Sequence, residues 1–143
     1  MSVLWGVIVV LLSLLSWGGQ ALSLLAPASA VRLKLMEAED DVEPTFWADV
    51  RAEALWDTLT LWTMVAGGVL LIVDVHAWAY FGLVGGGMYL YFGGRGILAR
   101  VAMVRRGLRI GSPQNVRLGY VFNVVWVAMA LITIVAAIVS IEG

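Results

Sequence analysis

The sequence predicts an all-α integral membrane protein, a four-helix bundle with a short interfacial amphipathic helix before its second span. The chain is 62% hydrophobic and only 13% charged, whereas soluble domains contain about a quarter charged residues. Its mean hydropathy is +0.93, and its apolar runs are long enough to cross a hydrocarbon layer about 30 Å thick as helices. A chain of 143 residues has room for four spans and for no separate soluble domain.

The glycine-rich run from 77 to 97 is expected to form the central packing helix. It carries no charge before Arg95. Its glycines are Gly82, Gly85, Gly86, Gly87, Gly93, Gly94 and Gly96. So much glycine is unfavourable in a soluble helix, but in a membrane small residues allow neighbouring backbones to approach closely. The residues that we expect at helix contacts are Gly82, Gly85, Gly86 and Gly93.

The first span is expected at about 3–25. The alternative is a cleaved signal peptide, because Ala28-Ser29-Ala30 resembles a small-residue cleavage site. Against cleavage, the run has no basic segment before it and exceeds the usual length of a signal-peptide core. We therefore expect this run to remain as a transmembrane helix.

The interfacial helix is expected to begin at Pro44, because proline suits the first position of a helix. Three acids at successive i, i+4 positions form one carboxylate stripe along it, namely Asp49, Glu53 and Asp57. Trp47 and Trp56 suit the headgroup level. The helix should lead directly into the second span, at about 54–73.

The third and fourth spans are expected at about 77–98 and 118–141. Only Asp74-Val75-His76 separates the second span from the third, so these two helices should be antiparallel neighbours. Ser112 and Pro113 are typical of a helix cap and first turn, and they should begin the last helix.

The charges predict the orientation of a single transmembrane domain, 1–143, with connections 26–53 and 99–117. All nine basic residues lie in or beside these connections, and neither terminus carries any. By the positive-inside rule both connections face the cytoplasm. We expect a bacterial inner-membrane protein with both termini outside the cytoplasm.

The strongest candidate site is an ion pair between Asp57 and Arg95, with Glu53 and Arg100 joining it. Both residues should lie near the inner ends of antiparallel neighbours, and a charge so close to hydrocarbon costs a few kcal/mol unless it is paired. The cluster is interpreted either as a structural bridge or as a polar pocket for a headgroup, an anionic ligand or a proton. Three further arginines are expected to contact lipid headgroups, namely Arg105, Arg106 and Arg109.

No metal site, cofactor or catalytic residue is expected. The chain has no cysteine and one histidine, His76. The acidic cluster from Glu37 to Glu43 lacks the glycine turn and ligand order of a calcium loop. It is interpreted as a loop that faces either solvent or the arginines.

Two short stretches in the final third of the chain resemble the MAPEG family of glutathione-using membrane enzymes. They are Ile97-Leu98-Ala99-Arg100-Val101 and Arg117-Leu118-Gly119-Tyr120. The resemblance implies four spans, outward termini, a homotrimer and an active site near the cytoplasmic side. The family's arginine, asparagine and glutamate pattern at the second span is not matched by the residues 51–57, which lack the asparagine.

The functional prediction is a non-catalytic accessory or scaffold subunit of a membrane complex. The alternatives are a MAPEG-like glutathione-dependent enzyme and a small transporter, although a transporter requires a titratable group well inside the bilayer. The expected partners are membrane lipids and either other membrane-protein subunits or further copies of this chain in an oligomer. No nucleic acid is expected.

Overall fold

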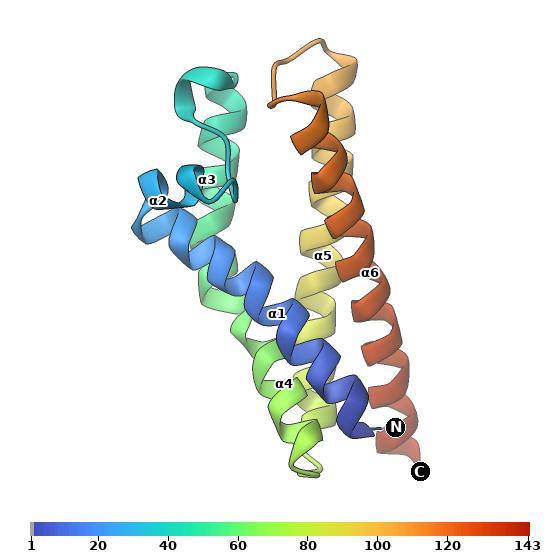
Figure 1. Ribbon diagram of the computed structural model, residues 1–143. Helices are drawn as coiled ribbons and strands as arrows, with labels where there is room; N and C mark the ends of the chain where they lie inside the picture. Colours follow the sequence, from blue (N-terminus) through green and yellow to red (C-terminus); the bar gives the residue numbers. More distant parts are fainter. Residues whose placement is uncertain (1) are drawn as a thin grey trace.

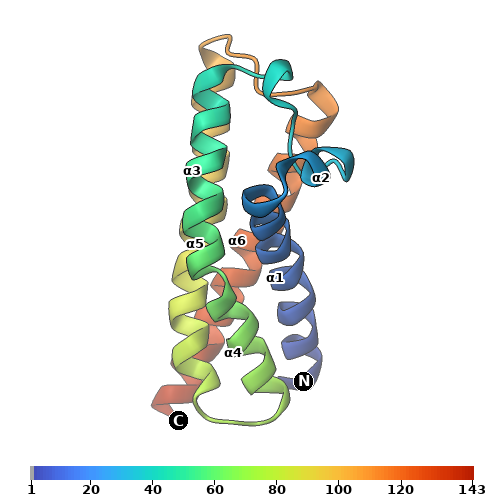
Figure 2. The ribbon, with the colours of Figure 1, turned by 90° about the vertical axis from the view of Figure 1, so that its left-hand side faces the viewer.

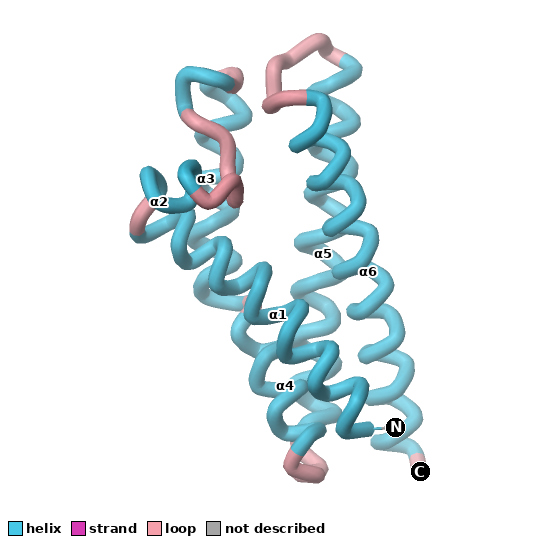
Figure 3. Tube along the Cα trace, in the orientation of Figure 1, coloured by secondary structure: helices cyan, strands magenta, loops and turns pink. Residues whose placement is uncertain are grey.

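A computed structural model describes residues 2–143, and these residues form helices and no strand (Figures 1 and 3). The predicted all-α class is confirmed. The elements in chain order are α1 (Ser2–Leu25), α2 (Pro27–Arg32), the 3₁₀ turn η1 (Glu39–Asp41), α3 (Pro44–Thr60), α4 (Trp62–Ile72), α5 (Trp78–Arg105) and α6 (Pro113–Glu142).

Three of the helices are long and apolar enough to cross a membrane. They are α1, the segment Pro44–Ile72 formed by α3 and α4, and α6, with 24, 29 and 30 residues. Their outer surfaces are apolar, since Leu4, Leu11 and Val135 are each at least 60% exposed. Hydrocarbon chains can cover such surfaces, whereas water would not favour them. These properties are those of an integral membrane protein.

Helix α5 differs from these three. Its 28 residues would extend about 42 Å, but the helix does not reach the same level of hydropathy. The physical reason lies in its composition, because it combines seven glycines with Arg95 and Arg100.

The helices form one bundle in which α1 packs on α4, α4 on α5, and α5 along α6. Both termini and the turn at 73–77 lie at one end, and α2, η1 and the 106–112 loop lie at the other (Figures 1 and 2). The predicted antiparallel hairpin of the second and third apolar runs is confirmed as α4 and α5.

The segment predicted as an interfacial helix continues into the following helix with an interruption at Leu61. Helix α3 stands upright beside α5, and α4 bends away from the line of α3 (Figure 2). Two acids of α3 explain why this helix stands beside α5. Asp49 and Glu53 both form ion pairs with Arg95 of α5.

The main apolar core lies where α1, α4, α5 and α6 meet. Its buried members are Val9, Leu61, Met64, Tyr89, Phe92, Met129 and Ala130. A second, smaller cluster of Val42, Phe46 and Ile110 lies among the connecting segments and the start of α3. The first connection is thereby packed against the second.

Hydrogen bonds between helices fix the position of α1. The Tyr89 hydroxyl and the Ser16 hydroxyl are 2.6 Å apart, and Tyr89 also donates to the Ser13 carbonyl at 3.0 Å. The Trp126 indole donates to the Leu12 carbonyl at 3.1 Å. The indole of Trp17 donates to the Thr58 carbonyl at 2.9 Å.

Candidate functional site

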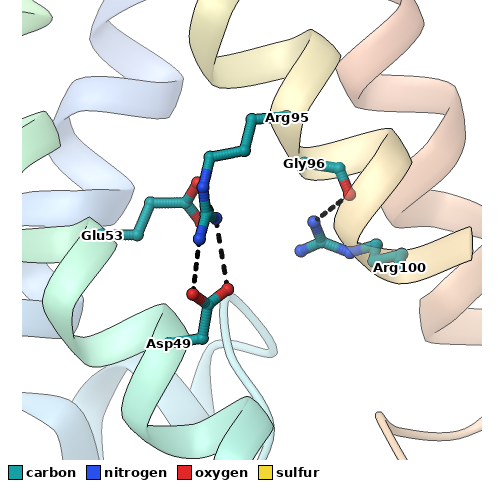
Figure 4. Close-up of polar contacts among 5 residues, drawn as sticks. All are labelled: Asp49, Glu53, Arg95, Gly96 and Arg100. Carbon is teal, nitrogen blue, oxygen red and sulfur yellow. Dashed lines mark hydrogen bonds and ion pairs between the residues drawn. The ribbon is translucent and has the colours of Figure 1, made fainter. Parts of the chain in front are cut away.

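The best-defined ionic cluster joins α3 to α5 through Arg95. Its guanidinium lies 2.5 Å from Asp49 Oδ1 and 3.1 Å from Glu53 Oε1, and it also donates to Asp49 Oδ2 at 3.2 Å (Figure 4). The two acids lie one turn apart on α3, so both can face the same cation. Arg95 is therefore neutralised by a forked contact with Asp49 and a further contact with Glu53.

The predicted pair of Arg95 with Asp57 is wrong. The ion pairs of Arg95 within residues 2–143 are with Asp49 and Glu53. Asp57 lies one turn deeper in the bundle and is 3% exposed. A long arginine side chain close to hydrocarbon extends towards the polar boundary, which brings Arg95 to the acids nearer the connections.

Asp57 is a buried acid that forms no ion pair among the described residues. Its Oδ2 atom is inaccessible and has no hydrogen-bond partner among the described residues. It lines a small cavity of about 160 Å³ together with Trp56, Tyr91 and the Arg95 cluster. A buried carboxylate without a partner is energetically unfavourable as an ion.

Replacement of Asp57 by asparagine is therefore expected to stabilise the protein by about 1 kcal/mol, because the shape is kept while the buried ionisable group is removed. Thermal unfolding in a mild detergent would measure the change. Asp74→Asn is the matched control, since Asp74 lies in the exposed turn and its left-handed φ of 56° suits asparagine. A clear loss of stability in Asp57→Asn would contradict the expectation.

Arg100 does not join the Arg95 cluster, contrary to the prediction. No carboxylate within residues 2–143 lies within 4.0 Å of its guanidinium. It donates to the Gly96 carbonyl of its own helix at 3.0 Å, on the side of α5 away from Asp49 (Figure 4). Its guanidinium carbon lies 5.9 Å from the centre of the Phe46 ring. Arg100 is thus a half-buried cation that forms no ion pair among residues 2–143.

Arg100 lines a larger cavity of about 270 Å³, here called the wide pocket. The pocket is bounded by residues 15–23 of α1, 46–53 of α3, 92–100 of α5, 115–126 of α6 and the segment 34–37. Its volume is close to the lower end of the range for ligand sites, about 300–1,000 Å³. Glu53 lines both cavities, and the wide pocket is also lined by Glu37, Lys34 and Arg100.

The four predicted packing glycines lie on the buried faces of α5. A Cβ atom at Gly85 would lie 2.7 Å from the backbone of Met64 on α4. At Gly86 and Gly93 it would lie 2.5 Å and 2.7 Å from side chains of α6, and at Gly82 3.3 Å from one. Gly87 and Gly94 differ, because no atom lies within 4 Å of such a position.

The arginines predicted to contact lipid headgroups lie at the end of α5 and in the next loop. Arg105, Arg106 and Arg109 are all exposed. The acidic connection packs against this loop and the start of α6, since the Glu43 amide donates to the Arg109 carbonyl at 2.7 Å and Glu37 accepts a hydrogen bond from Asn115 of α6 at 2.5 Å. Contact with headgroups remains a prediction.

Sequence reasoning missed the wide pocket and the role of Asp49 as the closest partner of Arg95. The i, i+4 spacing of Asp49, Glu53 and Asp57 could have indicated Asp49 as a partner, because all three acids share one face of α3. The pocket had no local signal, since its walls come from segments more than 100 residues apart.

Within residues 2–143 no group of three or more histidine, cysteine or acidic side chains is arranged to hold a metal ion. Comparisons with protein-family models, with curated proteins and with solved structures found no match. The fold therefore defines the class at the level of a helical membrane protein. Any more specific function has to be argued from the chain itself.

Proposed function

We propose that the chain is a four-span membrane protein that serves as a non-catalytic accessory subunit of a membrane complex. In this proposal α5 is the third span, and its glycines pack it between α4 and α6. The connections 26–53 and 99–117 face the cytoplasm and both termini lie outside, because the nine basic residues gather towards the connections. Polar headgroups of the bilayer would then surround the exposed arginines.

The outer face of α5 carries the proposal. It consists of residues at alternating spacings of four and three, namely Tyr80, Val84, Gly87, Tyr91, Gly94 and Leu98. The four larger side chains are more than half exposed, and the two glycines have open space beside them. This spacing is typical of the face along which one helix packs against another. Small residues on such a face allow the second helix to approach closely. We infer that a transmembrane helix of another subunit covers this face.

The test is gentle extraction from the native membrane, followed by determination of native mass and composition. Unrelated subunits in fixed stoichiometry are expected. The variant Gly87→Leu/Gly94→Leu should release them, because leucine fills the outer face of α5 without a clash inside this chain. Gly18→Leu, another glycine with open space around it, should retain them. A pure homo-oligomer, or a complex unaffected by the double substitution, would overturn the proposal.

A MAPEG-like glutathione-dependent enzyme is the second candidate, and one contact favours it. The two stretches that resemble the family meet at the wide pocket, where a Cβ atom at Gly119 would lie 3.2 Å from Arg100 Nε. This candidate requires saturable binding of glutathione, which isothermal titration calorimetry would detect. Failure of glutathione to bind would leave the accessory role as the proposal.

A further inference from the structure

The wide pocket has aromatic side chains at one end and a cation towards the other, and Ser16, Gln20 and Asn123 also line it. Phe92, Phe122 and Trp126 form the end nearer the middle of the bundle, with ring centres 5.4 Å apart for Phe92–Trp126 and 5.5 Å for Phe122–Trp126. Arg100 lies two helical turns from Phe92 towards the connections, a rise of about 12 Å along α5. An aromatic wall formed by α5 and α6 is thus followed, on α5, by a cation.

The cation is held in place, but it forms no ion pair among residues 2–143. Arg100 is backed by Gly119 and lies beside the Phe46 ring. Two acids line the pocket, and both are already engaged: Glu53 is bound to Arg95 at 3.1 Å, and Glu37 accepts a hydrogen bond from Asn115 at 2.5 Å. A positive charge near hydrocarbon without a direct ion-pair partner is costly, and an incoming anion would relieve that cost.

The position of this charge relative to the apolar wall determines the kind of anion. A fully polar anion would leave the aromatic end in contact with water, and a neutral hydrocarbon would leave Arg100 unneutralised. A molecule with a carboxylate or phosphate head and an alkyl chain satisfies both ends. The guanidinium can give such a head two parallel hydrogen bonds, while the chain lies against Phe92 and Trp126.

We propose that the wide pocket binds an anionic amphiphile, with its acidic head at Arg100 and its alkyl chain along the aromatic wall. The shared chemistry is an anionic oxygen group attached to a long alkyl chain, which either a free fatty acid or an acidic phospholipid of the membrane supplies. This inference is independent of the accessory role, because the wide pocket and the outer face of α5 have no residue in common.

The test measures equilibrium binding of oleate, and separately of dioleoyl phosphatidic acid, to the full chain in phosphatidylcholine nanodiscs. Arg100→Gln should weaken binding roughly tenfold or more, as expected for loss of charge-assisted hydrogen bonds. Arg105→Gln is the matched control, because Arg105 is exposed and lies outside the pocket wall. The two ligands distinguish a free fatty acid from a membrane lipid as the occupant.

A second pair of variants tests the pocket by filling it. Gly19 lies on the pocket wall and has no atom within 4 Å of a Cβ position. Gly19→Leu should therefore abolish binding while the fold is kept, whereas Gly18→Leu, on the outside of the same helix, should bind normally. A diazirine analogue of oleate should label the peptides that contain Phe92 or Trp126.

Binding of either ligand that depends on both Arg100 and Gly19 would support the proposal. It is overturned if neither ligand binds, or if Arg100→Gln and Gly19→Leu bind as strongly as their controls. Thermal unfolding of each variant distinguishes loss of the ligand from loss of the fold. Glutathione binding that requires Arg100 while both amphiphiles fail to bind would also overturn it.

Discussion

Replacement of Gly85 by alanine is expected to destabilise the bundle by about 1–3 kcal/mol, the usual cost of overpacking a close contact. The added Cβ would lie 2.7 Å from both Cα and N of Met64, and 3.0 Å from its Cβ. These are mainly backbone atoms of α4, so no rotation of a side chain can relieve the clash. Helices α4 and α5 would have to separate.

Gly87→Ala is the matched control, because Gly87 lies two residues further along the same helix and has open space beside it. Alanine forms helices better than glycine by up to about 1 kcal/mol, so this variant should be as stable as the parent or slightly more so. Unfolding of both variants in mixed detergent micelles measures the difference. Equal stabilities would mean that the α4–α5 contact is looser than described.

The second large effect is expected from Arg95→Ala. This change leaves Asp49 and Glu53 without their cation, and their side chains are only 25% and 13% exposed. Breaking a fully buried ion pair by removing one partner costs about 3–5 kcal/mol. Because Arg95 is itself 33% exposed, we expect a smaller loss of about 2 kcal/mol in the free energy of unfolding.

Double-mutant cycles should assign the partners of Arg95. The losses from Arg95→Ala and Asp49→Asn should be clearly non-additive, because the two side chains are in direct contact. The changes from Arg95→Ala and Asp57→Asn should be closer to additive, since these two form no ion pair. Strong coupling of Arg95 to Asp57 with none to Asp49 would contradict the geometry.

The parts of the fold that could be predicted depend on local sequence. The short connection at 74–76 required α4 and α5 to be antiparallel neighbours, and the Ser112–Pro113 pair marked the start of α6, where Ser112 accepts from the Asn115 amide at 3.3 Å. Both features need only a few adjacent residues. The short connections and the geometry of a helix then leave little freedom in how these helices are placed.

The partner of Arg95 could not be predicted in the same way. Asp49, Glu53 and Asp57 lie on one face of α3 and differ only in depth. The choice between them depends on the relative height of α3 and α5 and on the direction in which the arginine extends. A shift of one helical turn, about 5.4 Å, exchanges one acid for the next. The wide pocket depends on four helices together, and no single stretch of sequence encodes it.

The ionic link between α3 and α5 also has a consequence for how the protein is made. Translation delivers α3 before α5, so Asp49 and Glu53 reach the membrane while their cation is still unsynthesised. In the proposed topology the segment Pro44–Ile72 would carry uncompensated acids until then, and acids are costly where they approach hydrocarbon. We expect α3 to remain near the membrane surface during synthesis and to take its final depth only when the ribosome releases Arg95. Closing the α4–α5 hairpin would thus complete the insertion of the segment that precedes it.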